Sequence, residues 1–255
     1  MADLENKTLP SKLKSPIEFG RKLLITHWRA LVVLFVGVYV PLQIFGLLAL
    51  KVEQNLGGFP WDLPILLTVH SIAQPQLDQF AALLTKLGSF WTVLPMLMAI
   101  ALILLGQRRW RSLTYLLITA SGSAIINHTA KAFWHRVRPD LWVSAAPEFD
   151  YSFPSGHAMT SMTLVAILVI LTWDSVWCWF TVLLGSLYIF AIGWTRLYLG
   201  VHFPSDIIAG WLVAIAWAMG VNLIIRPFSQ SANIISDQPV SETKLLPEEQ
   251  QLINE

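Results

Sequence analysis

Long apolar runs separated by short polar segments dominate the chain between residues 30 and 225. Each run is close to the ~20 residues that an α-helix needs to cross the hydrocarbon core of a bilayer. The pattern predicts an all-α, polytopic membrane protein with six transmembrane helices. They are expected at about residues 30–50, 88–106, 112–130, 156–173, 177–195 and 205–225.

The segments outside these runs are more polar. Residues 60–86 mix apolar residues with Asp62, Asp78 and prolines, which favours short interfacial helices over a seventh span. The N-terminal segment lacks the apolar core and cleavage site of a signal peptide. The C-terminal segment is rich in Gln, Ser, Glu and Asn, which is typical of a disordered tail. The expected organisation is a cytoplasmic N-terminal segment, a six-helix transmembrane domain and a cytoplasmic tail, at residues 1–29, 30–226 and 227–255.

Composition agrees with a membrane protein. Hydrophobic residues make up 55% of the 255 residues, and charged residues only 13%, against about 25% in soluble domains. The net charge of +1 provides no general basic field, so no nucleic-acid partner is expected. Because Cys178 is the only cysteine, the chain cannot form an intrachain disulfide.

The positive-inside rule predicts the orientation of the chain. Lysines and arginines are concentrated in residues 1–29 and in "QRRWR" at 107–111. We therefore expect both termini to be cytoplasmic and residues 131–155 and 196–204 to lie on the extracytoplasmic face of the inner or plasma membrane. Three cations of the first outer segment oppose this bias, which predicts that they have a function there: Lys131, Arg136 and Arg138.

Three polar motifs fall at span ends on this outer face: "KAFWHRVRP", "PSGH" and "TRLYLGVHFPSD". We expect their cations to lie without carboxylate neighbours and so to form an anion site; they are Lys131, Arg138 and Arg196. Ser155 and Gly156 lead into the fourth span, and backbone amides at a helix N-terminus can hold an oxyanion. Together these groups predict a phosphate-binding cradle.

Two histidines add reactivity to the cradle. His202 and Asp206 are four residues apart, and Pro204 favours a helix start between them. The Asp206 carboxylate can then reach one ring nitrogen of His202 and leave the other free to attack. His157 lies on the opposite wall, where it can protonate a leaving oxygen and later activate water.

Two other interpretations of these residues fit the pattern less well. Single histidines and cations at span ends are usually packing residues or snorkelling anchors, but three complementary groups on one face argue against that explanation. Two histidines and an aspartate could also bind zinc. Three cations in the same pocket would repel a divalent ion, so no metal is expected.

The motifs resemble the three-part signature of the type 2 phosphatidic acid phosphatase superfamily, also called lipid phosphate phosphatases. The family pattern is Lys, six residues, Arg-Pro; then Pro-Ser-Gly-His; then Ser-Arg, five residues, His, three residues, Asp. The chain keeps every spacing and departs only at Thr195, where the family usually has Ser. The motifs cover residues 131–206, and the chain looks most like the bacterial phosphatidylglycerophosphatase B-like membrane phosphatases.

This resemblance implies a phosphatase that needs no metal or other cofactor and forms a phosphohistidine intermediate. It implies that His202 is the nucleophile, Asp206 its orienting partner and His157 the general acid and then base. The implied phosphate ligands are Lys131, Arg138, Ser155, Gly156 and Arg196.

The implied substrate is a lipid phosphate that enters from the bilayer: phosphatidic acid, phosphatidylglycerol phosphate or undecaprenyl pyrophosphate. A lipid phosphotransferase using the same site stays open. An anion transporter is a further alternative, although a transport pathway needs charges at several depths, and here the unusual charges gather at one face. The sequence predicts neither the lipid nor an oligomeric state.

Overall fold

Every regular element in the described residues, 16–54 and 58–227 of a computed structural model, is a helix. The all-α prediction is therefore confirmed for this part of the chain, while most of the predicted terminal segments lie outside it. The elements are α1 (Pro16–Leu34), a π-helical turn (Phe35–Tyr39), α2 (Val40–Gln54), α3 (Asp62–His70), α4 (Pro75–Leu84), a 3-10 turn (Thr85–Gly88), α5 (Phe90–Gly106), α6 (Trp110–Trp134), α7 (Gly156–Leu171), α8 (Trp177–Tyr198) and α9 (Pro204–Ile225).

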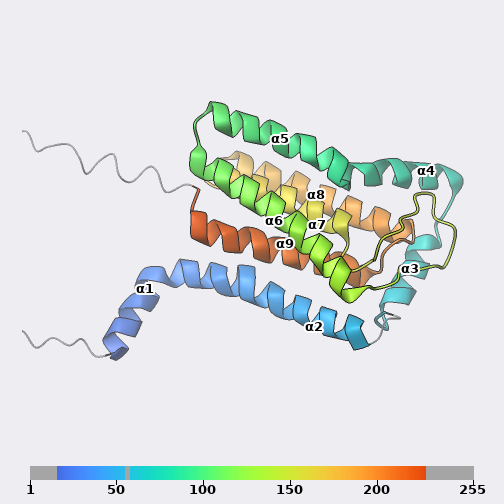
Figure 1. Ribbon diagram of the computed structural model, residues 1–255, viewed down its shortest axis with the longest axis horizontal. Coiled ribbons are helices and arrows are strands. Elements are labelled where there is room, and N and C mark those ends of the chain that lie inside the picture. Colours follow the sequence, from blue (N-terminus) through green and yellow to red (C-terminus); the bar gives the residue numbers. More distant parts are fainter. Residues whose placement is uncertain (1–15, 55–57, 228–255) are drawn as a thin grey trace, which may run out of the picture.

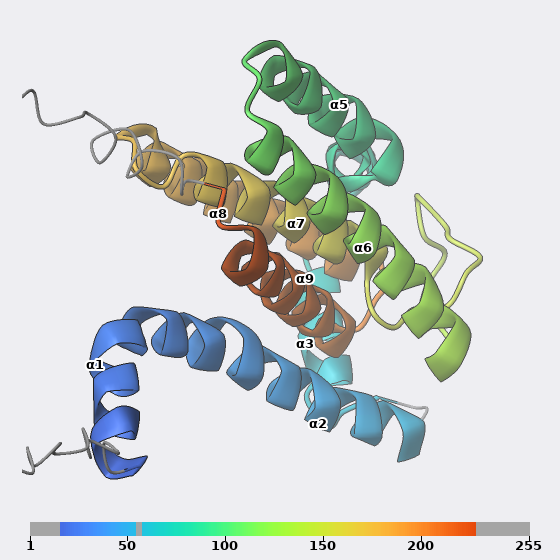
Figure 2. The same ribbon diagram turned by 60° about the vertical axis from the view of Figure 1, so that its left-hand side comes forward.

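Helix α7 lies at the centre of the bundle. It packs against α5, α6, α8 and α9, and α9 in turn packs against α2. Figures 1 and 2 show α5 and α2 on opposite sides of the bundle, with α6, α7, α8 and α9 between them. Large apolar side chains on the outer helices remain exposed, for example Leu102, Ile125, Leu183 and Leu187. An apolar outer surface is what a bundle surrounded by lipid requires.

Helices occupy all six stretches predicted to cross the membrane, but the count of six crossings is not confirmed. Of the described segments, four are both long and apolar enough: Ile25–Gln54, Pro75–Gly106, Trp177–Tyr198 and Pro204–Ile225. Helix α7 is apolar but shorter. The region expected to be interfacial holds the short helices α3 and α4, yet α4 continues through the 3-10 turn toward α5 as part of one candidate span.

Four helix ends meet at one end of the bundle (Figure 1). Helix α6 stops at His135, which takes a left-handed conformation with φ 47°. Helix α7 starts at Ser155, whose hydroxyl accepts a hydrogen bond from the Ala158 amide. Helix α9 starts with Pro204 at its first position. These signals bring residues 131–157 and 196–206 to the same place.

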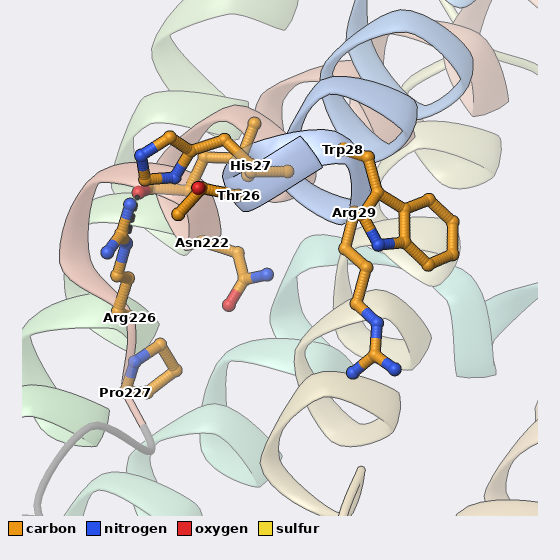
Figure 3. A pocket seen from close by; sticks show the side chains of 9 residues that line it. Thr26, His27, Trp28, Arg29, Asn222, Arg226 and Pro227 are labelled. Carbon is orange, nitrogen blue, oxygen red and sulfur yellow. Dashed lines mark hydrogen bonds between the residues drawn. The ribbon is translucent and has the colours of Figure 1, made fainter. Parts of the chain in front are cut away.

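The opposite end of the bundle carries a different hollow, of about 610 Å³ (Figure 3). Thr26 and His27 of α1 line it together with Asn222 and Arg226 at the end of α9. Its lining contains basic side chains and no carboxylate. It lies away from the predicted motif residues, so it contributes nothing to the cradle.

The contact between α7 and α9 depends on Gly210. A Cβ at this position would lie 2.8 Å from the Ser155 carbonyl oxygen and 3.2 Å from the Met159 amide nitrogen. Gly210→Ala should therefore push α9 away from the start of α7 and lower stability by about 1–3 kcal/mol, the usual cost of overpacking. Thermal unfolding in detergent measures this loss.

Gly220→Ala is the matched control, because it lies on the same helix and an added Cβ there meets nothing within 4 Å. We expect it to keep or raise the unfolding temperature, since Ala is the better helix former. Equal unfolding temperatures for the two variants would contradict the close α7–α9 contact.

Candidate active site

The structure brings the three predicted cations together at the end of the bundle. Lys131 comes from the last turn of α6, Arg138 from the segment after it, and Arg196 from the last turn of α8. Their side chains are largely or fully buried, at 12%, 10% and 1% exposed. Buried cations at this density need an anion among them.

Glu148 supplies that anion. One carboxylate oxygen accepts from Arg196 and lies 3.4 Å from His157 Nδ1. The other lies 2.7 Å from an Arg138 nitrogen and 3.8 Å from His202 Nε2. Burial alone would raise the pKa of Glu148, but Arg196, His157 and Arg138 hold it below its ordinary value. The carboxylate is therefore ionised between two arginines and two histidines.

Asp150 adds a second carboxylate, which pairs with both Lys131 and Arg138. Burial would raise the pKa of Asp150, and these two cations lower it. The expectation that the cations lie without carboxylate neighbours is therefore wrong. Both acids lie just before "PSGH", but the distance in sequence between Glu148 and Arg196 gave no sign that these two would meet.

His202 points its Nε2 atom toward Arg138 and Glu148. Arg138 lies 2.9 Å from Nε2, and because arginine can only donate, Nε2 must accept. The proton of the neutral ring is then on Nδ1, which faces Asp206 Oδ2 at 3.4 Å. Burial, together with the nearby cations Arg138, Arg196 and Lys131, puts the pKa of His202 well below its usual value. The ring is therefore neutral near pH 7, with a lone pair on Nε2.

The Ser155 amide and hydroxyl at the start of α7 make hydrogen bonds within the protein. The Ser155 amide donates to the Asp206 carbonyl oxygen at 3.0 Å, and the Ser155 hydroxyl caps α7. The Ser155 amide is thus not free for an anion in this arrangement, whereas the Ser155 hydroxyl only accepts and keeps its O–H as a donor. The contact instead ties the first turn of α7 to the first turn of α9. At Gly156, an added Cβ would lie 3.2 Å from the side-chain oxygen of Asn127.

Arg196 has a partner that the motif did not indicate. It donates to the Thr85 hydroxyl at 2.6 Å, from the 3-10 turn between α4 and α5. The neighbouring Thr195 hydroxyl donates to the Ile192 carbonyl oxygen at 2.7 Å within α8. The residue that departs from the family pattern therefore points its hydroxyl into its own helix.

A cavity of about 780 Å³ extends from this cluster between α5, α6 and α7. Lys131, Glu148, Asp150 and His157 line its polar end. The remaining walls are mostly apolar, with residues such as Leu94, Leu97, Met98, Ala101, Leu116, Leu117 and Ile125. Its size is within the range of small-molecule pockets, and its shape combines a charged end with an apolar body.

The site residues do not form a metal centre in the part of the chain that the structure describes. No group of three or more His, Cys, Asp or Glu side chains there is arranged to hold a metal ion. The cluster is built instead from cations that bridge carboxylates.

Similarity to known proteins agrees with the geometry. The PAP2 superfamily model matches residues 111–229, which include both histidines and all three cations. An undecaprenyl-diphosphatase from Sulfolobus acidocaldarius is 31% identical over 166 residues, 63% of this chain and 75% of that relative. The chain belongs to the PAP2 superfamily.

Two further PAP2 relatives come from Bacillus subtilis. Phosphatidylglycerophosphatase B is 29% identical over 146 residues, 55% of this chain and 71% of that relative. The crystal structure of a transmembrane PAP2 type phosphatidylglycerolphosphate phosphatase superposes with a TM-score of 0.68 at 23% identity, over 76% of this chain and 98% of that one. The helical bundle is therefore a PAP2 membrane phosphatase fold.

The bridging position of Glu148 makes a prediction for anion binding to this PAP2 site. Glu148→Gln should tighten the binding of inorganic phosphate by about tenfold, or 1.4 kcal/mol, because phosphate no longer has to displace a carboxylate from Arg138 and Arg196. Isothermal titration of the purified protein in detergent measures the change.

Glu53→Gln is the control, because Glu53 is exposed on α2 and does not line the pocket. It removes the same charge and should leave phosphate affinity as it is. Unchanged or weaker phosphate binding by Glu148→Gln would contradict the displacement of this carboxylate.

Proposed function

We propose that this PAP2 protein is an integral-membrane phosphatase that hydrolyses a lipid phosphate monoester or pyrophosphate through phosphorylation of His202. The observation that carries the proposal is the position of Glu148. Its carboxylate is paired with Arg138 and Arg196, and a ring nitrogen of His157 and of His202 lies within 3.8 Å of it. A phosphate group has the charge and the oxygens to take these partners.

Substrate binding begins with the displacement of Glu148. His202 is fully buried with Glu148 in place, so the segment that carries Glu148 must move before a phosphate reaches Nε2. The phosphate oxygens then pair with Lys131, Arg138 and Arg196. Amides of the first turn of α7, beginning at Gly156, supply the uncharged donors.

Two steps complete the reaction. The Nε2 lone pair of His202 attacks phosphorus, the bond from phosphorus to the bridging oxygen breaks, and protonated His157 gives its proton to that oxygen. The lipid leaves as an alcohol, or as a monophosphate if the substrate was a pyrophosphate. His157 then takes a proton from water as the water attacks phosphorus, the nitrogen–phosphorus bond breaks, and inorganic phosphate leaves.

The cavity between α5, α6 and α7 supports a lipid as the substrate. Its charged end fits a phosphate head group, and its apolar walls fit an acyl or isoprenoid chain. Relatives are named for undecaprenyl diphosphate and phosphatidylglycerophosphate. We therefore propose these two lipids and phosphatidic acid as the substrates to test.

The orientation that we propose puts both termini in the cytoplasm and the active site on the opposite face, with six crossings. The basic "QRRWR" segment between α5 and α6, and the end of α9 that carries Arg226, lie at the end of the bundle opposite to the junction of α8 and α9, which holds His202 (Figure 1). A basic cytoplasmic end follows the positive-inside rule. Residues 1–29 and 227–255 flank the proposed catalytic domain.

Phosphotransfer is the alternative outcome of the same chemistry. The phosphohistidine would pass its phosphate to a lipid or sugar hydroxyl in place of water. Labelled phosphate that appears on such an acceptor, and not in solution, would show transfer. An anion transporter has less support, because the charged side chains of the site gather at one end of the described bundle.

The role of His202 predicts a large effect of one substitution. His202→Ala should lower release of phosphate from a lipid phosphate panel by at least about 10⁴-fold, because it removes the nucleophile. Colorimetric phosphate assays of purified protein measure the loss. His128→Ala, an exposed histidine on α6, is the control and should keep full activity. Substantial phosphate release by His202→Ala would rule out the mechanism.

Metal independence predicts a separate result. Dialysis against EDTA should leave the rate unchanged, because cationic side chains and a histidine provide the chemistry that a metal would otherwise supply. Atomic emission on the same sample reports residual metal. A loss of activity that only added zinc or magnesium restores would show that a metal takes part.

A further inference from the structure

Three charged side chains lie buried beneath His202, outside the phosphate pocket. Asp62 begins α3, Arg136 follows α6, and Asp206 lies in the first turn of α9. Their side chains are 1%, 0% and 0% exposed. The family signature includes only Asp206, so the function of the other two needs its own explanation.

Arg136 joins the two carboxylates. One terminal nitrogen donates to Asp62 Oδ2 at 2.8 Å. The other donates to Asp206 Oδ1 and, at 2.8 Å, to the Ser205 hydroxyl. The guanidinium also lies over the Phe203 ring, 4.3 Å from its centre. Arg136 is therefore held in one position, with a carboxylate on each side.

The pairing divides the two oxygens of Asp206 between different tasks. Arg136 takes Oδ1, which leaves Oδ2 to accept from the Phe203 amide at 2.9 Å and to face His202 Nδ1. A free carboxylate could rotate and exchange its oxygens. Arg136 prevents this rotation and fixes the oxygen that orients His202.

Asp62 is equally fixed, although it is 143 residues away from its partner on α9. It accepts from the Ser205 amide at 3.0 Å and from the Ser205 hydroxyl at 2.6 Å. The backbone at Gly58 packs closely against Asp62 and Arg136. Its φ is +100°, and an added Cβ would lie 3.0 Å from an Arg136 nitrogen. The start of α3 is thus docked on the first turn of α9.

The charge of this trio depends on Asp62. The charges of Asp206 and Arg136 alone would sum to zero, and Asp62 brings the net charge of the three side chains to minus one. When Nε2 of His202 gains a phosphoryl group, the ring becomes a cation, which a negative charge next to Nδ1 stabilises in a buried site. The groups that face the ring from the pocket are Arg138 and Glu148, with Lys131, Arg196 and His157 around them. Once substrate displaces Glu148, the trio still places a negative charge directly next to Nδ1 of the ring.

We propose that Asp62 and Arg136 are positioning residues for His202: Arg136 fixes the Asp206 carboxylate, and Asp62 supplies the charge that Arg136 would otherwise cancel. This inference rests on the proposed function of His202 as nucleophile. The polar contacts of Asp62 and Arg136 go to each other, to the Phe59 amide, to Ser205 and to Asp206, and not to the proposed phosphate ligands, so the trio acts on the rate of phosphorylation and not on substrate binding.

Asp62→Asn tests the charge with little change of shape. We expect kcat to fall about 10- to 100-fold, because the loss of a charged hydrogen-bond partner in a buried site has an effect of this size. KM should stay within about threefold, because the substrate contacts remain. Rapid-quench measurements should place the loss in formation of the phosphoenzyme. Asp78→Asn is the control, since Asp78 bonds Tyr198 at the same end of the bundle and lies outside the trio.

A double variant separates charge from structure. Asp62→Asn with Arg136→Gln returns the net charge to minus one, so its kcat should exceed that of Asp62→Asn. Loss of packing alone predicts that the double variant is no better. If Asp62→Asn does not fold, the double variant is compared with the unsubstituted protein, and a kcat within about 100-fold of it is expected.

The outcomes are distinguishable. If the unsubstituted protein releases no phosphate from any lipid, or His202→Ala stays active, the proposed function fails. If the unsubstituted protein releases phosphate and His202→Ala is inactive, the proposed function stands. A folded Asp62→Asn variant with full kcat then overturns only the charge role of Asp62. A double variant that is no faster than Asp62→Asn also overturns the charge role. Where the single variant does not fold, a double variant with a kcat more than about 100-fold below that of the unsubstituted protein overturns it.

Discussion

The need to balance buried positive charge governs this end of the bundle. Lys131, Arg138 and Arg196 lie close together, largely out of water, where repulsion between like charges is weakly screened. Glu148 and Asp150 supply the balance in the arrangement described, and phosphate would supply it in the reaction. We propose that the site is built for an anion and that Glu148 occupies the position that the substrate phosphate needs. Access then depends on movement of the segment before "PSGH".

The helices serve this arrangement by bringing two N-termini and two C-termini together. The bond from the Ser155 amide to the Asp206 carbonyl joins α7 to α9 at the point where their motifs begin. Beneath it, Arg136 joins α9 to α3 through Asp206 and Asp62. The pocket and its support are thus two layers of charge, one facing the substrate and one facing the back of His202.

Spacing along the chain predicted much of this site. Apolar run lengths located α5, α6, α7, α8 and α9 to within a few residues, whereas the first predicted run, 30–50, covers the end of α1, the π-helical turn and most of α2. The motifs identified cations and histidines that the fold brings together. The number of membrane crossings did not follow, because α7 is apolar but short, and α6 is long enough but is not among the four segments that are also apolar enough. The contacts of Glu148 with Arg196 and of Asp62 with Ser205 also escaped prediction, since these partners lie 48 and 143 residues apart and a single sequence does not encode such contacts locally. Asp62 was interpreted as an interruption of an apolar segment, whereas it is a buried partner of Arg136.

The most direct test of the account is to find the covalent intermediate. The protein would be mixed with lipid phosphate labelled in the phosphoryl group, quenched in alkali within milliseconds, and digested for mass spectrometry, because phosphohistidine is stable in alkali. We predict phosphate on His202, with its amount rising and falling on the timescale of turnover. Phosphate on another residue, or turnover at full rate without any phosphorylated histidine, would contradict the account.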